Sequence, residues 1–266
     1  MPFSANPQKS TLSEDDITEV TLRQMKDNKE GVTSYPILDF DERAMGLLCS
    51  GVRETLQESA VTPAGGRIYQ FCKRAFDILA SALALLLLSV PLCILMLIIY
   101  LDDKDSPIFS QVRLTEKGRP FKMYKLRSMC VDAEARFAEV QKENQSDGLA
   151  FKADDDPRIT KIGKFIRKTS LDELPQFWNV LKGDMSIIGP RPPLPREVVL
   201  YTPEHMDRLL VKGGLSCICQ TEGRSDMPFE EWVDTDIEYI KTRSAGLDLK
   251  LMFKTVTAVL LRKGAK

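Results

Sequence analysis

Two adjacent carboxylates, Asp172 and Glu173, have the residue types and spacing best suited to chemistry in this sequence. One carboxylate of such a pair can attack phosphorus while the other binds a metal or orients its partner, provided that cations lie close by. The pair also has a structural interpretation, because Ser170 followed by Glu173 fits the capping box that begins a helix. Both interpretations can hold, since a helix N-terminus also favours a bound phosphate.

Histidine-based chemistry is nearly excluded, because His205 is the only histidine in the chain. Zinc sites built on histidine clusters and triads with a histidine base are therefore disfavoured, which leaves carboxylates, hydroxyls and bound cations. The six cysteines are scattered and form no disulfide framework, so a reducing compartment is expected. Cys217 and Cys219 would form half of a metal site, but the sequence offers no second half.

Basic residues are concentrated on both sides of the carboxylate pair. Six basic residues and one acidic residue lie in 111–127, and five basic residues and no acidic one lie in 158–168. Arg191 lies in the loop Gly-Pro-Arg-Pro-Pro (189–193), whose prolines preorganise the backbone around it. Arginine binds phosphate bidentately, so a phosphate-bearing substrate is one explanation for these cations. An ordinary solvated face is the alternative.

Short strands and helices are expected to position these residues. The alternation in 121–126 predicts a strand with a cationic face. Residues 158–168 predict a short basic amphipathic helix of the kind that lies at a bilayer surface. Two further short helices are expected at 13–29 and 41–58, followed by a linker rich in Pro and Gly at 61–66.

An uncharged run of 24 residues, from Ile78 to Leu101, precedes the basic region. As a continuous helix it would be about 36 Å long, enough to cross the apolar core of a bilayer. Pro91 donates no hydrogen bond and Ser89 can bond locally, so the helix should bend near its middle. Three alternatives stay open: a buried core helix, a membrane span, and a helix that enters, bends and returns to the same face.

Charge divides the chain unevenly. The formal net charge is −1, which disfavours nucleic acid as a partner because a long nucleic-acid footprint needs a strong basic excess. Residues 1–50 carry nine acidic and five basic side chains, whereas the remainder has a small basic excess. Three regions follow: an acidic, partly ordered N-terminal extension (1–66), a juxtamembrane and membrane-helix region (67–104) and a third region (105–266).

From Lys73 to the C-terminus the sequence resembles the bacterial sugar transferase family, the monotopic polyprenyl-phosphate phosphoglycosyl transferases. The most specific matching string is DPRITKIGKFIRKTSLDELPQFWNVLKGDMSIIGPRP (156–192). The other matching strings are KRAFDILAS (73–81), FKMYKLRSM (121–129), EGR (222–224) and LDLK (247–250).

The resemblance implies a fold and an activity. The fold would be α-rich α+β, in a monotopic membrane protein with a re-entrant kinked helix, surface amphipathic helices and a small β element. The activity would transfer a sugar-1-phosphate from a nucleotide diphosphate sugar, usually a UDP-sugar, to polyprenyl (undecaprenyl) phosphate and release UMP. It would depend on Mg²⁺ and begin the assembly of a cell-surface glycan or exopolysaccharide. Residues 105–266 would then be a catalytic domain at the cytoplasmic face of the bacterial inner membrane.

The family's functional residues fall on residues of this sequence. Asp172 would be the nucleophile that forms a covalent phosphosugar intermediate, and Glu173 would assist through the metal or by orienting the incoming phosphate. Both carboxylates are the expected Mg²⁺ ligands. The Ser-Pro pair that breaks the family's re-entrant helix falls on Ser89 and Pro91, with one residue more between them. The expected contacts of phosphate, nucleotide or substrate are Lys125, Arg127, Arg158, Arg167, Arg191 and Asp236.

One segment departs from the family pattern. The usual Pro-Gly-x-Thr-Gly-x-x-Gln-Val is replaced by GGLSCICQT (213–221). We therefore expect the sugar or nucleotide pocket to differ in shape from that of the family. Two functions remain. The intact Asp172, Glu173 and Arg191 favour an active phosphoglycosyl transferase, and the altered segment favours a catalytically weak scaffold that binds polyprenyl phosphate at the bilayer. In either case the extension 1–66 is expected to contact a second copy of the chain or partners in glycan assembly.

Overall fold

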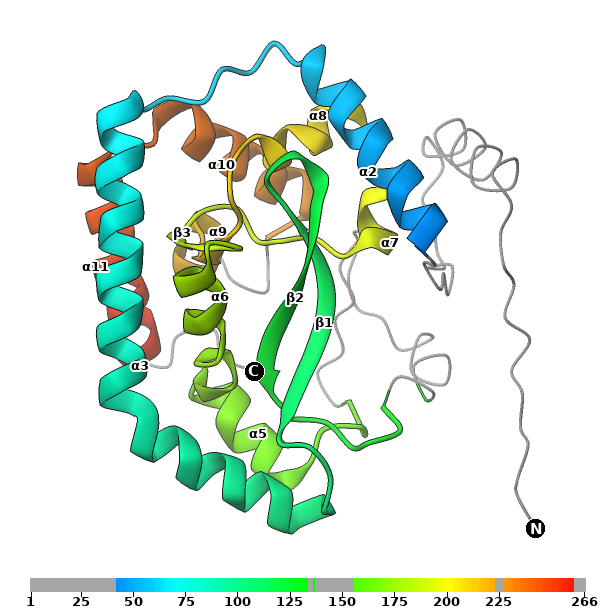
Figure 1. Ribbon diagram of the computed structural model, residues 1–266, viewed down its shortest axis with the longest axis vertical. Helices are drawn as coiled ribbons and strands as arrows, with labels where there is room; N and C mark the ends of the chain where they lie inside the picture. Colours follow the sequence, from blue (N-terminus) through cyan, green and yellow to red (C-terminus); the bar gives the residue numbers. More distant parts are fainter. Residues whose placement is uncertain (1–41, 134–135, 137–155, 223–226, 261–266) are drawn as a thin grey trace.

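A twisted antiparallel hairpin lies at the centre of the molecule (Figure 1). The computed structural model describes residues 42–133, 136, 156–222 and 227–260. The hairpin consists of β1 (Ile108–Thr115) and β2 (Arg119–Leu126), joined by the 3-10 turn η1 (Glu116–Gly118). A second small sheet pairs β3 (Ser186–Ile188) in parallel with β4 (Gly214–Ser216). The strand predicted at 121–126 is confirmed, and so is the small β element. The predicted single cationic face is wrong, because Lys122 and Lys125 lie three residues apart and therefore on opposite faces of β2.

Helices surround the two sheets and make up most of the described structure, which confirms the α-rich class (Figure 1). The helices predicted at 41–58 and within 158–168 are confirmed as α2 and α5, whereas the one predicted at 13–29 lies outside the described residues. The helical elements are α2 (Glu42–Gln57), α3 (Arg67–Asp103), α5 (Lys161–Lys168), η3 (Leu171–Glu173), α6 (Gln176–Lys182), α7 (Pro195–Val198), α8 (Pro203–Met206), η4 (Asp207–Leu210), α9 (Ile218–Glu222), α10 (Phe229–Thr242) and α11 (Ala245–Leu260).

α2 packs against the turn end of the hairpin. Cys49 and Val52 of α2 form a buried cluster with Leu114 of β1. Gly118 ends η1 with a φ of +69°, and a Cβ at this position would lie 2.9 Å from Cγ1 of Val52. Glycine therefore suits both the left-handed backbone of the turn and the close approach of α2. The part of the N-terminal extension from residue 42 onward thus contributes to the core.

α3 contains the whole uncharged run and changes direction partway along its length (Figure 1). Pro91 lies within the helix, and the Ser89 hydroxyl donates to the carbonyl oxygen of Leu86 at 2.8 Å, in agreement with the local bonding expected of Ser89. By length and composition α3 is able to cross a membrane, and only 6% of its most apolar stretch is buried. The core helix of a soluble protein buries such a stretch, so the buried-core alternative is disfavoured.

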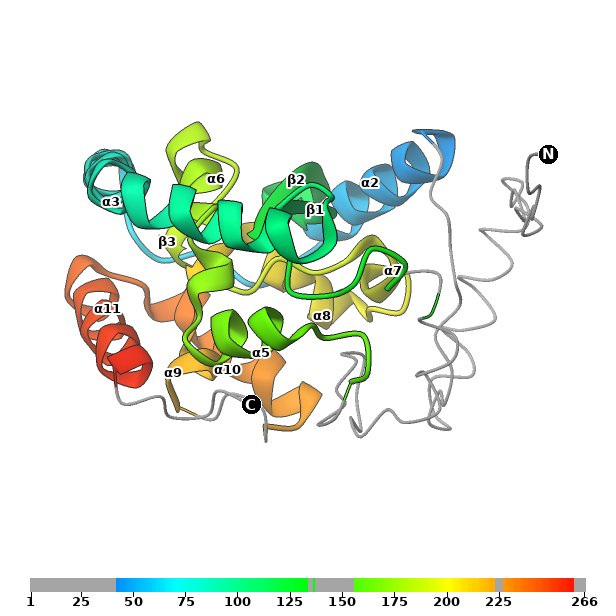
Figure 2. The same cartoon turned by 90° about the horizontal axis from the view of Figure 1, so that it is seen from below.

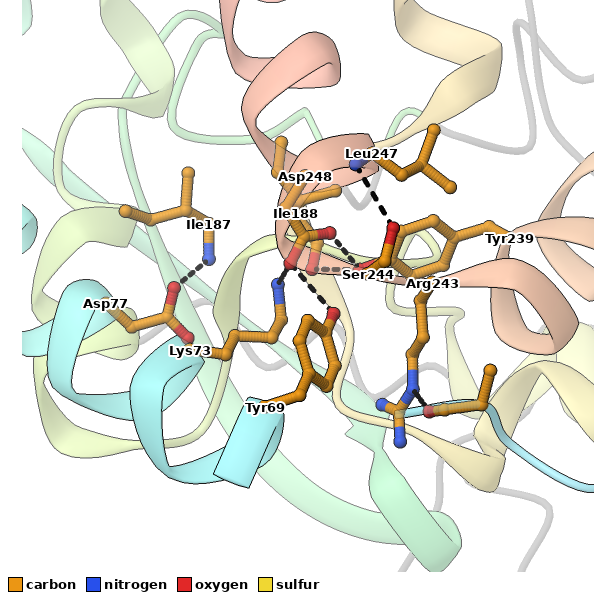
Figure 3. A network of polar contacts seen from close by, with 11 residues as sticks. Tyr69, Lys73, Asp77, Ile187, Ile188, Tyr239, Arg243, Ser244, Leu247 and Asp248 are labelled. Carbon is orange, nitrogen blue, oxygen red and sulfur yellow. Dashed lines mark hydrogen bonds and ion pairs between the residues drawn. The ribbon is translucent and has the colours of Figure 1, made fainter. Parts of the chain in front are cut away.

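The first end of α3 is attached to α11 by a polar network (Figure 3). Asp248 of α11 accepts hydrogen bonds from the Tyr69 hydroxyl and from Nζ of Lys73, both at 2.8 Å. The Tyr239 hydroxyl of α10 donates to the other carboxylate oxygen of Asp248 at 2.8 Å. One turn beyond Lys73, the carboxylate of Asp77 accepts a hydrogen bond from the backbone N–H of Ile187. Lys73 is therefore engaged within the protein.

The second end of α3 packs on the base of the hairpin and runs beside α5 (Figure 2). Ile99 is buried with Leu126 of β2 and Ile166 of α5. Arg127, the residue after Leu126, forms ion pairs with Asp103 at 3.2 Å and with Asp105 at 3.3 Å. Both ends of α3 therefore contact the same folded body. Several apolar side chains between them are more than half exposed, among them Leu83, Leu86, Leu87 and Val90.

The Asp248 network predicts a measurable loss of stability on substitution. Asp248→Asn removes the charge that pairs with Lys73 and weakens the hydrogen bonds from both tyrosines, so the free energy of unfolding should fall by about 1–3 kcal/mol. For a domain of this size that change lowers the apparent Tm by roughly 3–10 °C, as thermal unfolding in lipid nanodiscs would show. Asp234→Asn, on an exposed position of α10, is the matched control. Equal melting of the two variants would contradict the role of the network.

Candidate active site

Four of the predicted site residues meet where β2, α5 and η3 come together. Nζ of Lys125 lies 3.2 Å from Oε1 of Glu173 and 4.0 Å from Oδ2 of Asp172. Arg167 lies in the last turn of α5, and its positive charge acts on the Asp172 carboxylate. Residues 125, 167, 172 and 173 thus form one cluster of two carboxylates and two cations, which the sequence predicted as a set without placing its members.

Asn179 of α6 attaches this cluster to the hairpin. Its side-chain amide donates to the carbonyl oxygen of Lys122 at 2.7 Å and accepts from the backbone N–H of Tyr124 at 3.0 Å. Asn179 is fully buried and takes the place of a neighbouring strand along the edge of β2. Sequence reasoning missed this residue. The one signal available was a polar residue within the apolar string FWNVL (177–181).

The turn that carries the carboxylates is a 3-10 turn, and the capping-box prediction is wrong. Ser170 has a left-handed backbone (φ 56°, ψ 20°) and makes no side-chain capping hydrogen bond. The backbone N–H of Glu173 donates to the carbonyl of Ser170 at 3.3 Å, and α6 begins only after Pro175. Pro175 has no N–H to donate to the carbonyl of Leu171, which disfavours a regular α-helix through this position. Strained backbone of this kind at a non-glycine residue is typical of functional sites.

Burial and charge act in opposite directions on Asp172. The residue is 9% exposed, and this burial raises the pKa of its carboxyl above the ordinary value. The negative charge of Glu173 raises the pKa as well, whereas the positive charges of Lys125 and Arg167 lower it. A poorly hydrated carboxylate next to cations suits attack on a phosphate, because the cations stabilise the charge of the phosphate group.

Three other predicted ligands are held in ion pairs of their own. Arg127 binds the acidic end of α3, as described above. The Arg158 guanidinium pairs with Asp156 at 2.6 Å, and both side chains are at most 5% exposed. Asp236 pairs with Arg208 at 2.7 Å, and each is 1% exposed. In the structure these groups serve the packing of their own segments, and their contacts with a substrate stay predictions.

Arg191 differs from these residues, because no hydrogen bond or ion pair joins its side chain to the part of the chain that the structure describes. It is half-buried in the loop 189–193. Two backbone hydrogen bonds attach this loop, for which the sequence predicted a preorganised backbone, to residues of β4. The N–H of Gly214 donates to the carbonyl of Pro190 at 2.8 Å, and the N–H of Gly189 donates to that of Ser216 at 3.0 Å.

The carboxylate pair offers oxygen ligands of the kind that Mg²⁺ prefers in proteins. No group of three or more His, Cys, Asp or Glu side chains gathers as a metal site within residues 42–133, 136, 156–222 and 227–260. Mg²⁺ is commonly bound through one or two carboxylates together with water and substrate phosphates. Asp172 and Glu173 supply two carboxylates with unoccupied lone pairs beside the cations, so these residues fit the ion. Cys217 and Cys219 form no disulfide with each other, and both are buried.

The chain belongs to the bacterial sugar transferase family, whose sequence profile matches residues 68–262. The galactosyl transferase CpsE of Streptococcus agalactiae is 46% identical over 195 residues, covering 73% of this chain and 43% of CpsE. The undecaprenyl-phosphate galactose phosphotransferase of Salmonella typhimurium is 40% identical over 207 residues, covering 75% of this chain and 42% of that protein. The exopolysaccharide production protein ExoY of Rhizobium meliloti is 35% identical over 213 residues, covering 79% and 92%. The chain thus spans less than half of the first two relatives and most of ExoY.

The electrostatics of the cluster predict opposite pKa changes in two variants. Lys125→Met removes a positive charge and should raise the pKa of Asp172, whereas Glu173→Gln removes a negative charge and should lower it. Carboxyl ¹³C NMR of aspartate-labelled protein, with the Asp172 signal assigned by Asp172→Asn, measures both. Lys122→Met, an exposed position on the opposite face of β2, is the control and should leave the titration unchanged. Shifts of the same sign in the two variants would contradict this account of the cluster.

Proposed function

We propose that this chain transfers a sugar-1-phosphate from a nucleotide diphosphate sugar, a UDP-sugar, to polyprenyl (undecaprenyl) phosphate and releases UMP. The product begins the assembly of a cell-surface glycan or exopolysaccharide. The observation that carries the proposal is the buried Asp172 between Lys125 and Arg167, with Glu173 beside it. Relatives support the substrates: one is named an undecaprenyl-phosphate galactose phosphotransferase, and another a UDP-glucose:undecaprenyl-phosphate glucose-1-phosphate transferase from Escherichia coli.

The reaction has two displacements at the same phosphorus atom. In the first, an Asp172 carboxylate oxygen forms a bond to the phosphorus that carries the sugar, and the bond from this phosphorus to the UMP oxygen breaks. In the second, a phosphate oxygen of the lipid attacks the same phosphorus, the bond to Asp172 breaks, and the polyprenyl diphosphate sugar is formed. Lys125 and Arg167 stabilise the charge of the transferred phosphoryl group in both steps. Glu173 orients the incoming phosphate.

Asp172 and Glu173 are the proposed ligands of Mg²⁺. When bound, this ion supplies positive charge that stabilises the diphosphate and the departing UMP. The protein itself makes the two carboxylates of the pair differ in their contact with Lys125. Lys125 is closer to Glu173 than to Asp172, so Asp172 keeps an oxygen free of a close ion pair and available for attack.

We further propose that α3 is a re-entrant anchor, with both of its ends at the cytoplasmic face of the bacterial inner membrane. Lys73 near one end contacts α11, and Asp103 at the other contacts Arg127, the residue directly after β2, so both ends are joined to one folded body. A straight crossing would place the ends on opposite sides of the bilayer. The bend in α3 and the exposed apolar residues between its ends support a hairpin that enters lipid. The anchor holds Asp172 where a lipid phosphate can reach it.

Release of UMP tests the activity. Purified full-length chain in nanodiscs, supplied with Mg²⁺, undecaprenyl phosphate and a panel of UDP-sugars, should release UMP with at least one donor and only when a donor is present. The panel also identifies the sugar. A well-folded protein that releases no UMP with any donor would exclude the transferase and favour the scaffold that binds polyprenyl phosphate.

The covalent intermediate is tested separately. Without lipid acceptor, intact-mass spectrometry should detect an adduct of one phosphosugar on the wild-type chain. Asp172→Asn should abolish the adduct, because a carboxamide oxygen is a poor nucleophile toward phosphorus. Asp234→Asn is the matched control and should retain it. An adduct that persists in Asp172→Asn would assign the nucleophile to another residue.

A further inference from the structure

Arg113 of β1 is a buried arginine that forms no ion pair with an acidic residue in the described part of the chain. Three arginines are buried among the described residues, and Arg158 and Arg208 each pair with an aspartate. Arg113 is 5% exposed, yet no described carboxylate lies within 4.0 Å of its guanidinium. Its Nη1 donates to the carbonyl of Pro192 at 2.9 Å and its Nη2 to Oε1 of Gln111 at 3.0 Å. Its Nε has no hydrogen-bond partner among the described residues. A buried charge in this condition is costly unless a ligand supplies the opposite charge.

The nearest charges make this imbalance larger. Burial and then the positive charge of Arg191 lower the pKa of Arg113 to about 10, so the guanidinium remains protonated near neutral pH. Arg196 acts in the same direction as Arg191, and Glu197 is the one carboxylate that opposes them among the main influences. Glu197 is also engaged elsewhere, because its Oε2 accepts the backbone N–H of Leu194 at 2.8 Å. Among the described residues, the side chains named here that act on Arg113 thus include two cations and one carboxylate.

The backbone of the loop that carries Arg191 is fixed beside Arg113. On one side β1 binds the loop, through the Arg113 contact with Pro192 and a hydrogen bond from the N–H of Leu114 to the carbonyl of Pro193 at 3.0 Å. On the other side the residues around β4 bind the loop. A Cβ on Gly214 would collide with the backbone of Gly189, so glycine is needed for this contact. The backbone of Arg191 is therefore held close to β1, and the positive charge of Arg191 acts on Arg113.

We propose that Arg113 and Arg191 together form a phosphate-binding site, in which a substrate phosphate supplies the missing negative charge. Arg191, half-buried and without a partner in the described structure, contacts the phosphate directly. Arg113 is a positioning residue: it holds the loop of Arg191 through Pro192 and contributes the second positive charge. Paired guanidinium groups suit the geometry and charge of phosphate. This inference rests on the proposed function for the identity of the ligand, because both substrates of that reaction carry phosphate.

The site extends along the hairpin from the carboxylate cluster. Arg113 is opposite Phe121, and Lys125 is opposite Phe109, so the two cations share one face of the hairpin. They lie four residues apart along it, which corresponds to about 13 Å between their backbone positions. The Asp172→Asn substitution therefore lies away from Arg113. Binding at Arg113 and Arg191 can be measured in that background, where no phosphoryl transfer through Asp172 takes place.

Binding of phosphate-bearing probes tests the site without turnover. Isothermal titration of the full-length Asp172→Asn chain in nanodiscs would use UDP as one probe and a short-chain polyprenyl phosphate as the other. Arg113→Gln should weaken binding of at least one probe about tenfold, and Arg113→Lys should restore part of the loss because it keeps the charge. Arg119→Gln is the matched control, since Arg119 is a half-exposed arginine of the same hairpin that pairs with Asp184. It should bind both probes like the parent.

The two probes distinguish the source of the phosphate. Loss confined to UDP assigns the site to the nucleotide, and loss confined to the polyprenyl phosphate assigns it to the lipid. Parental affinity of Arg113→Gln for both probes would overturn the proposal. If Arg113→Gln does not fold, Arg191→Gln replaces it, because the Arg191 side chain makes no hydrogen bond or ion pair within the described structure. Parental affinity of Arg191→Gln for both probes would equally overturn the proposal.

Failure of this inference is distinguishable from failure of the proposed function. UMP release by the wild type together with parental binding by Arg113→Gln would remove the phosphate site and leave the transferase. Absence of UMP release together with weakened binding by Arg113→Gln would remove the transferase and leave a phosphate-binding site.

Discussion

The attachment of α6 to the free edge of β2 through Asn179 is the constraint on which the candidate site depends. A strand edge must satisfy its backbone N–H and carbonyl groups when it is buried. One side-chain amide satisfies both the carbonyl of Lys122 and the N–H of Tyr124. Since η3 directly precedes α6 and Lys125 directly follows Tyr124, this contact places the carboxylate turn beside the strand's cation.

Lys125 lies at different distances from the two carboxylates of the site. Lys125 makes its closer ion pair with Glu173, so Asp172 is influenced by positive charge without being covered by it. Burial opposes ionisation of Asp172, whereas the charges of Lys125 and Arg167 favour it. These opposing effects leave a poorly hydrated carboxylate in a cationic surrounding, which is the condition that attack on a phosphate group requires.

The long helix α3 is attached at both ends by different forces. Its first end depends on the buried carboxylate of Asp248, which collects hydrogen bonds from Tyr69, Lys73 and Tyr239 (Figure 3). Its second end depends on apolar packing of Ile99 and on the ion pairs of Arg127. The exposed apolar stretch between these attachments is consequently held against one body, beside the same β2 strand that carries Lys125.

The sequence by itself determined the local elements and the residue types of the site, because periodicity and charge act between near neighbours. The strand at 121–126, the helices at 41–58 and 158–168 and the grouping of Asp172 with nearby cations followed from it. Tertiary structure decided which distant residues meet. Asn179 bonds to Tyr124 across 55 residues and Asp248 to Lys73 across 175, and no local pattern marks such pairs. It also overruled the local capping pattern at Ser170, since packing and Pro175 impose a 3-10 turn there.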